Sequence, residues 1–163
     1  MRISIILKMK IHIKSILTES FADYKKCSML ICGCKCTWKC GKELCQNSPL
    51  AKTPTKEIDV EKIVYNYLKN DLTEAIVFAG LEWLDQFLEL LECIEAFRKK
   101  TNDDIIVYTG YDKEEITEHL MTLKKYKNII MKFGRYIPNQ EKHFDPVLGV
   151  HLASSNQFAE KFS

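Results

Sequence analysis

The sequence predicts an α/β fold with an open and mainly parallel sheet. Two observations predict it: short apolar runs recur along the chain, and each is separated from the next by a stretch with the period of an amphipathic helix. Apolar runs without polar alternation are typical of strands buried on both faces, and strands that alternate with helices form parallel βα units. The 163 residues, 46% of them hydrophobic and 28% charged, suffice for a single domain with a real core over residues 1–163.

The amino-terminal part predicts a first strand after a candidate short extension. Apolar and polar residues alternate over residues 9–14, which is the period of a half-buried strand. Met9 is a second candidate start residue, and the sequence leaves open whether residues 1–8 are a dispensable extension or part of the domain. Residues 3–17 are apolar but are interrupted by lysines, which argues against a signal peptide and against a membrane span of about twenty apolar residues.

Four buried strands and three helices are expected next. The strands are predicted over residues 28–31, 75–80, 104–110 and 128–134, and the helices over residues 60–68, 84–100 and 113–126. Apolar residues recur three and four positions apart in each helix, which gives each helix one buried face. Residues 47–55 contain two prolines and predict a loop, whereas residues 135–163 predict a loop with a short strand or helix packed on the domain.

The distinctive residues of the chain follow the predicted strands. Residues 32–45, rich in cysteine, come after the first buried strand, residues 80–82 close the second, and residues 109–111 close the third. Because ligands bind outside the carboxyl ends of parallel strands, these three segments are predicted to share one site.

The charge predicts no polyanionic partner. The 24 Lys and Arg residues are nearly balanced by 22 Asp and Glu, and the net charge of +2 is evenly spread. A nucleic-acid or anionic-membrane binder would show a basic patch or stripe, so neither partner is expected.

The cysteines predict a metal or redox site in a reducing compartment. Six of the seven cysteines lie between residues 27 and 45, and only Cys93, within an apolar helical pattern, stands apart. Secreted domains stapled by disulfides spread their cysteines and are usually too small to bury a core, whereas clustered cysteines in a cytosolic protein bind metal or do redox chemistry. We therefore expect a cytoplasmic protein.

Three of the clustered cysteines have a spacing that suits metal binding. Cys36, Cys40 and Cys45 read C-x3-C-x4-C. Three thiolates on one loop can hold an iron–sulfur cluster, and with Cys32 or Cys34 as a fourth ligand they can hold tetrahedral zinc. The spacing alone leaves both metals open.

Four short motifs follow one another along the chain. They are the cysteine loop, Gly-Leu-Glu at residues 80–82, Tyr-Thr-Gly-Tyr at residues 108–111 followed by acidic residues, and Ser-Ser-Asn-Gln at residues 154–157. In this order they resemble the radical S-adenosylmethionine enzymes, and in particular the activating proteins of anaerobic ribonucleoside-triphosphate reductase. The resemblance covers residues 29–157. The chain differs from the family in the second gap of the cysteine motif, four residues instead of two, and in Leu81, which replaces a glycine.

The resemblance implies a fold and a metal. It implies that the sheet is a partial (βα) barrel and that Cys36, Cys40 and Cys45 hold a 4Fe-4S cluster. Three protein ligands would leave the fourth iron open for the amino and carboxylate groups of S-adenosylmethionine. One electron from the cluster would cleave the sulfonium of that cofactor, and the resulting radical would abstract a hydrogen, so the hard chemistry belongs to the cofactor.

The resemblance also implies the cofactor site and the partners. Gly80, Leu81 and Glu82 would hold the methionine ammonium, with glycine allowing a close backbone approach, and Thr109 and Gly110 would complete the site. The implied partners are a glycyl-radical enzyme, the anaerobic ribonucleotide reductase, and an electron donor of the flavodoxin or ferredoxin type. The chain is thus expected to be an oxidoreductase that generates a glycyl radical, and no side chain is predicted to be catalytic.

Two alternatives to this function stay open. One is a radical enzyme that acts on another substrate, and the other is an iron–sulfur or zinc module without turnover. Outside the predicted site, His119, His143 and His151 are not spaced as metal ligands and are expected at the surface or in packing. Lys132 and Arg135 are expected to be solvated charges.

Overall fold

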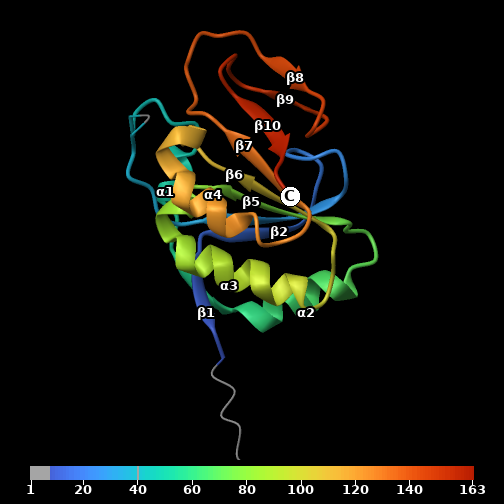
Figure 1. Cartoon of the computed structure of the whole chain (residues 1–163). Coiled ribbons are helices and arrows are strands. Elements are labelled where there is room, and N and C mark those ends of the chain that lie inside the picture. The colour runs from blue at the N-terminus through green and yellow to red at the C-terminus, as the bar shows by residue number, and fades with distance from the viewer. Residues whose placement is uncertain (1–7, 40) are drawn as a thin grey trace, which may run out of the picture.

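The computed structural model describes residues 8–39 and 41–163 (Figure 1). Most of the candidate amino-terminal extension and the predicted ligand Cys40 therefore lie outside the described residues.

A sheet of six strands, in the order β10-β7-β6-β5-β3-β2, forms the centre of the molecule. Its four inner strands are parallel: β3 (Ser28–Gly33), β5 (Ala75–Gly80), β6 (Asp104–Tyr108) and β7 (Ile129–Phe133). At the two edges, β2 (Ser15–Ser20) and β10 (Phe158–Lys161) pair antiparallel with their neighbours. The predicted α/β class with a mainly parallel sheet is confirmed.

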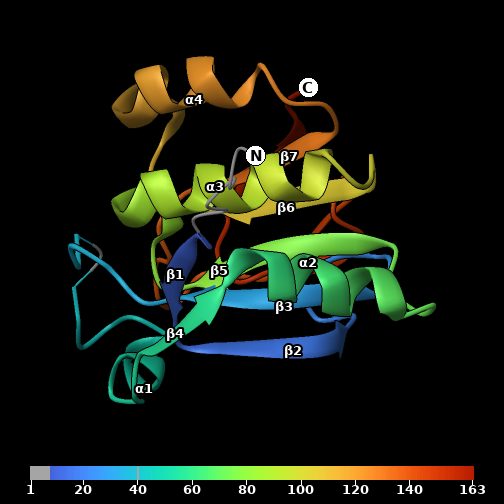
Figure 2. The same ribbon diagram turned by 90° about the horizontal axis from the view of Figure 1, so that it is seen from below.

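Three helices cover one face of this sheet (Figures 1 and 2). They are α2 (Val60–Lys69), α3 (Phe87–Arg98) and α4 (Thr117–Leu123), and 3-10 turns at Trp83–Gln86 and Lys113–Ile116 lead into α3 and α4. All three lie within the predicted helical stretches, apart from one residue at the end of α2. Within the described residues, no helix is both long and apolar enough to cross a membrane.

The two faces of the sheet are packed differently. On the helix face, large side chains such as Ile31, Phe78 and Val107 pack with α2 and α3 in the main core. The opposite face has smaller side chains, Cys32 and Ala79 among them, and a smaller core. The β2–β3 connection and the hairpin of β8 (His143–Asp145) and β9 (Val150–Leu152) contribute side chains to that core from outside the sheet, and Leu50 packs against it.

Some elements were not expected from the sequence. Strand β4 (Lys56–Asp59) was not predicted, and it pairs antiparallel with the predicted amino-terminal strand, β1 (Lys10–Ile13), in a separate two-stranded ribbon. The predicted loop over residues 47–55 contains a one-turn helix, α1 (Ser48–Ala51), because proline is tolerated in the first turn of a helix. Strand β2 was missed because its exposed half lacks the alternation that marks a strand.

Candidate metal centre

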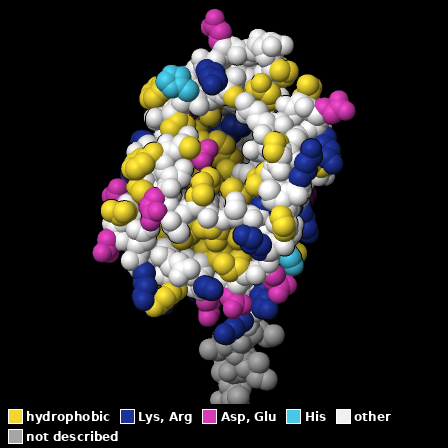
Figure 3. Space-filling view, turned by 180° about the vertical axis from the view of Figure 1, so that it is seen from behind, with side chains coloured by type: hydrophobic (Ala, Val, Ile, Leu, Met, Phe, Trp, Pro, Cys, Tyr) yellow, Lys and Arg dark blue, Asp and Glu magenta, His cyan; other side chains and the backbone are white. Residues whose placement is uncertain are grey.

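A cavity of about 500 Å³ opens on the face of the sheet opposite α2, α3 and α4, at the carboxyl ends of the parallel strands. Figure 3 shows this face hollowed, with apolar side chains on the floor of the hollow. The predicted site residues that line it are Cys36, Cys45, Gly80, Leu81, Glu82, Thr109 and Gly110. The fold therefore brings together every predicted ligand and cofactor-binding residue that the structure describes, from three separate segments of the chain.

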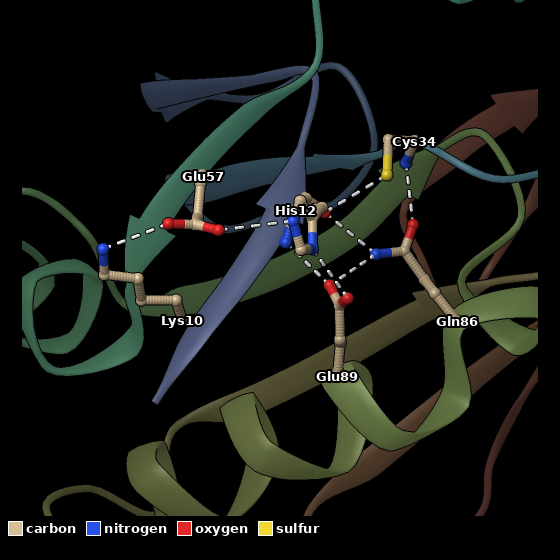
Figure 4. A network of polar contacts seen from close by, with 6 residues as sticks. All are labelled: Lys10, His12, Cys34, Glu57, Gln86 and Glu89. Atoms are coloured by element: carbon tan, nitrogen blue, oxygen red, sulfur yellow. Dashed lines mark hydrogen bonds and ion pairs between the residues drawn. The ribbon is translucent and has the colours of Figure 1, made fainter. Parts of the chain in front are cut away.

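The start of the cysteine segment, which we define as residues 34–55, is held by a buried glutamine (Figure 4). The Oε1 atom of Gln86 accepts hydrogen bonds from the backbone N–H groups of Cys34, at 2.7 Å, and Lys35, at 3.3 Å. Its Nε2 atom donates to the carbonyl of His12, at 2.9 Å, and to Glu89, at 3.2 Å. Gln86 is only 4% exposed, so it fixes the point at which the segment leaves β3.

The first turn of the segment is held by Asp85 and Tyr111. One carboxylate oxygen of Asp85 accepts the N–H of Thr37 at 2.8 Å, and the other accepts the hydroxyl of Tyr111 at 2.6 Å. The hydroxyls of Tyr111 and Thr37 lie 3.2 Å apart. Asp85 follows β5 and Tyr111 follows β6, so two neighbouring strand ends position the segment beside Cys36.

The turn that carries Cys45 is tied to the end of β5. The side-chain amide of Asn47 donates to the carbonyl of Gly80 at 2.7 Å, and the hydroxyl of Ser48 donates to the carbonyl of Lys42. These contacts bring the turn that carries Cys45 to the same strand end as Glu82.

Both described cysteines of the predicted ligand set receive backbone hydrogen bonds at sulfur. The N–H of Trp38 lies 3.3 Å from the Sγ atom of Cys36, and the N–H of Asn47 lies 3.4 Å from the Sγ atom of Cys45. Such bonds favour a negatively charged sulfur and are one of the means by which a protein tunes an iron–sulfur cluster. The donor set at this end of the cavity therefore suits thiolate-bound metal.

The two neighbouring cysteines lie in different surroundings. Burial raises the pKa of the thiol of Cys32, which lines the floor of the cavity, and the pKa of the thiol of Cys34. The Cys34 thiol donates to the carbonyl of His12 at 3.4 Å. A raised pKa opposes the thiolate form that binds metal. Among residues 8–39 and 41–163, no three His, Cys, Asp or Glu side chains gather as a metal site.

Glu82 is a buried carboxyl group at the carboxyl end of β5. It is 9% exposed, and its two oxygens accept the N–H groups of Leu84, at 3.1 Å, and Gly110, at 2.8 Å. Burial raises its pKa to about 7, although these hydrogen bonds act in the opposite direction. A carboxyl group held in this way inside a cavity suits a cationic group of a ligand.

Lys132 corrects a prediction from the sequence. It was expected to be a solvated charge, but it is 7% exposed and lines the same cavity. Its Nζ atom donates to the carbonyl of Gly134 at 3.0 Å, and burial lowers its pKa to about 8. The sequence did contain a signal for this burial, because the lysine lies inside the otherwise apolar run of a buried strand.

The other predicted polar residues have structural contacts. Arg135 forms an ion pair with Glu115 at 2.7 Å, and the side-chain amide of Gln157 donates to the carbonyl of Gly134 at 3.3 Å. His119 packs edge-on against the ring of Phe87, as expected of a packing residue. His151 lies at the surface, where it also lines the cavity, a position that its sequence context did not indicate.

Gly80 is the position at which the backbone leaves no room for a side chain. Its φ angle is +85°, and a Cβ atom there would lie 2.9 Å from the Cβ of Cys32 and 3.0 Å from a methyl of Leu50. We expect Gly80→Ala to lower the free energy of unfolding of the metal-free chain by about 2–4 kcal/mol, because left-handed strain and overpacking add. Denaturant unfolding measures this loss.

Gly110 provides the matched control for that measurement. It lies on the next loop of the same cavity, its φ angle is not in the left-handed region, and an added Cβ would meet nothing closer than 3.5 Å. Gly110→Ala should therefore change the free energy of unfolding by less than about 1 kcal/mol. Equal losses in the two variants would contradict the crowding at Gly80.

Comparison with known families finds one model that matches the chain, the 4Fe-4S single cluster domain, over residues 25–158. Neither the curated proteins nor the solved structures contain a match. The matched range includes the whole cysteine segment and all the parallel strands whose ends form the cavity. The chain therefore belongs to the family of 4Fe-4S single cluster domains.

Proposed function

We propose that this protein is a radical S-adenosylmethionine enzyme that generates a glycyl radical on an anaerobic ribonucleotide reductase. The observation that carries the proposal is the shared cavity, in which two cysteines of the ligand motif meet Gly80, Glu82 and Gly110. Membership of a cluster-binding family supports the metal, and the cavity has room for a small charged cofactor beside the cysteines.

Cys36, Cys40 and Cys45 would hold the cluster. The hydrogen bonds to the sulfurs of Cys36 and Cys45 and the cavity beside both residues support this ligand set. When bound, the cluster would supply the single electron that cleaves the sulfonium bond of S-adenosylmethionine. Three protein ligands leave one iron open to that cofactor.

The remaining residues of the cavity would bind and orient the cofactor. Glu82 would accept hydrogen bonds from the methionine ammonium, and its own position is fixed by the N–H groups of Leu84 and Gly110. Gly80 allows the cofactor to approach the backbone closely. Leu81 and Thr109, which are 7% and 2% exposed, would shape the apolar and polar walls around it.

The open face of the sheet supports a protein substrate. The helices α2, α3 and α4 all lie on the other face, and the sheet ends at two antiparallel edges instead of closing, as a partial (βα) barrel would (Figures 1 and 3). A loop of a large partner could reach the cavity from this side. The cysteines are clustered in sequence instead of being spread along the chain as in domains stapled by disulfides. This pattern fits a reducing cytoplasm, where we place the reaction.

Anaerobic reconstitution tests this function. The chain is loaded with iron and sulfide, reduced with dithionite and incubated with S-adenosylmethionine, and 5′-deoxyadenosine is measured. The reductase is then added, and a glycyl radical is sought by EPR. A cluster without cofactor cleavage would reduce the protein to an iron–sulfur module, and cleavage without a glycyl radical would point to another substrate.

A further inference from the structure

Positive charge is concentrated on the segment that carries the predicted cluster ligands. Residues 34–56, the cysteine segment and the first residue of β4, contain five of the 24 Lys and Arg residues but only one of the 22 Asp and Glu residues. The rest of the chain is slightly acidic. The near-neutral total, from which we expected no charged patch, hides this separation.

The five lysines, which we call the lysine rim, are all exposed. They are Lys35, Lys39, Lys42, Lys52 and Lys56. None of them forms an ion pair with another residue in the described ranges 8–39 and 41–163. In Figure 3 the edge of the molecule formed by this segment lies on the right, and Lys and Arg side chains gather along it. Charges that are neither buried nor paired project their field into solvent.

Apolar side chains lie among the lysines of the rim. Leu44 is 56% exposed, and its N–H donates to the carbonyl of Gly41, whose own N–H donates to the carbonyl of Trp38. The ammonium of Lys42 lies 5.6 Å from the centre of the Trp38 ring. An apolar centre with a charged border is the usual anatomy of a protein-binding surface, whereas a polyanion needs only the charges.

The segment has two sides with different access. Cys36 and Cys45 line the cavity on the inner side, where the cofactor and the substrate loop would lie. The lysine rim is on the solvent side of the same short segment. An electron carrier that docks on the rim would approach the cluster without entering the cavity.

We propose that the lysine rim, together with Leu44 and Trp38, is the docking surface for an acidic one-electron carrier protein that reduces the cluster. The inference rests on the ligand assignment of the proposed function. In the step itself, the reduced carrier loses one electron and the oxidised cluster gains it, and no proton or group is transferred. Opposite charge would steer the carrier to the rim and make its association fall with salt.

Cluster reduction without S-adenosylmethionine tests the proposal, so the result does not depend on cofactor cleavage. The reconstituted full chain is mixed anaerobically with a reduced, acidic flavodoxin, and the loss of visible cluster absorbance is followed by stopped flow. In the rim variant, Lys42→Glu, Lys52→Glu and Lys56→Glu are combined. In the control variant, Lys99→Glu, Lys100→Glu and Lys125→Glu make the same change of charge on exposed residues near the ends of α3 and α4.

We expect the rim variant to be reduced by flavodoxin about tenfold or more slowly at low salt, and the control variant to match the wild type. Salt should slow the wild type and leave the rim variant nearly unchanged, and dithionite should reduce all three chains equally fast. Equal flavodoxin rates in the rim variant and the wild type would overturn the proposal, as would an equal loss with dithionite. The proposal would also be overturned if the wild type bound RNA or anionic vesicles more tightly than flavodoxin and the rim variant lost that binding.

Discussion

Replacing Cys45 with alanine is expected to abolish stable cluster binding. The substitution removes one of three proposed thiolate ligands, and loss of a residue that merely orients a metal ligand already costs about 10–100-fold in affinity. We therefore expect iron affinity to fall by on the order of 100-fold or more. Iron and sulfide analysis of the anaerobically reconstituted chain measures the loss, and circular dichroism checks that the fold is retained.

Cys34 supplies the matched control. It belongs to the same segment and is also partly exposed, but its thiol donates to the carbonyl of His12 and burial raises its pKa. Cys34→Ala should therefore keep its full content of iron and sulfide. A Cys45→Ala chain with a complete cluster would remove Cys45 from the ligand set. A wild-type chain that bound one zinc ion and no sulfide would contradict the cluster itself.

Replacing Glu82 with glutamine is expected to have the next largest effect. If Glu82 binds the methionine ammonium, the variant loses a charged hydrogen bond inside a cavity, worth about 1.5–3 kcal/mol. The affinity for S-adenosylmethionine should fall about 10–100-fold, while the cluster still forms. Equilibrium binding to the reconstituted chain measures the affinity. Glu114→Gln, which alters an exposed carboxylate outside the cavity, should bind the cofactor as the wild type does.

The same variant should change how the metal-free chain responds to pH. The pKa of Glu82 is about 7 in the folded chain against an ordinary value of 4.5, so the folded state binds the proton more tightly than the unfolded state. The Glu82 contribution to the free energy of unfolding is then greatest below about pH 4.5, and falls by about 3 kcal/mol as the pH rises to about 7. Glu82→Gln should lack this fall, and denaturant unfolding at several pH values compares the two chains. If the free energy of unfolding changed with pH in the same way in the variant and the wild type, the pKa of Glu82 would not be raised in the folded chain.

The sequence was most informative where hydrophobic burial decides the structure. The runs 75–80 and 104–110 predicted strands because they are buried on both faces, and β5 matches its predicted range. The glycine and acid that close the run at residues 80–82 predicted the cavity edge, because parallel strands end together. The fold class and the position of the cavity thus follow from patterns of residues close together in sequence.

The supports of the site could not be predicted because they join residues far apart in sequence. Gln86 joins the start of the cysteine segment to β1, and Asp85 joins that segment to Tyr111. An amide or a carboxylate just before a helix is common, and its sequence context does not show where its hydrogen bonds go. The burial of Lys132 follows from its place in the sheet, which only the folded chain reveals.

The anchoring of the cysteine segment at both ends bears on its spacing. Gln86 ties residue 34 to β1, and β4, which begins as the segment ends, pairs with the same strand. The segment is thus a closed loop whose ends are already fixed, and the entropy of closing such a loop grows only with the logarithm of its length. Two added residues in a loop of this size cost about 0.1 kcal/mol. The wider gap between Cys40 and Cys45 is therefore nearly neutral for folding. Only the geometry of metal binding would limit how many residues can separate the two cysteines.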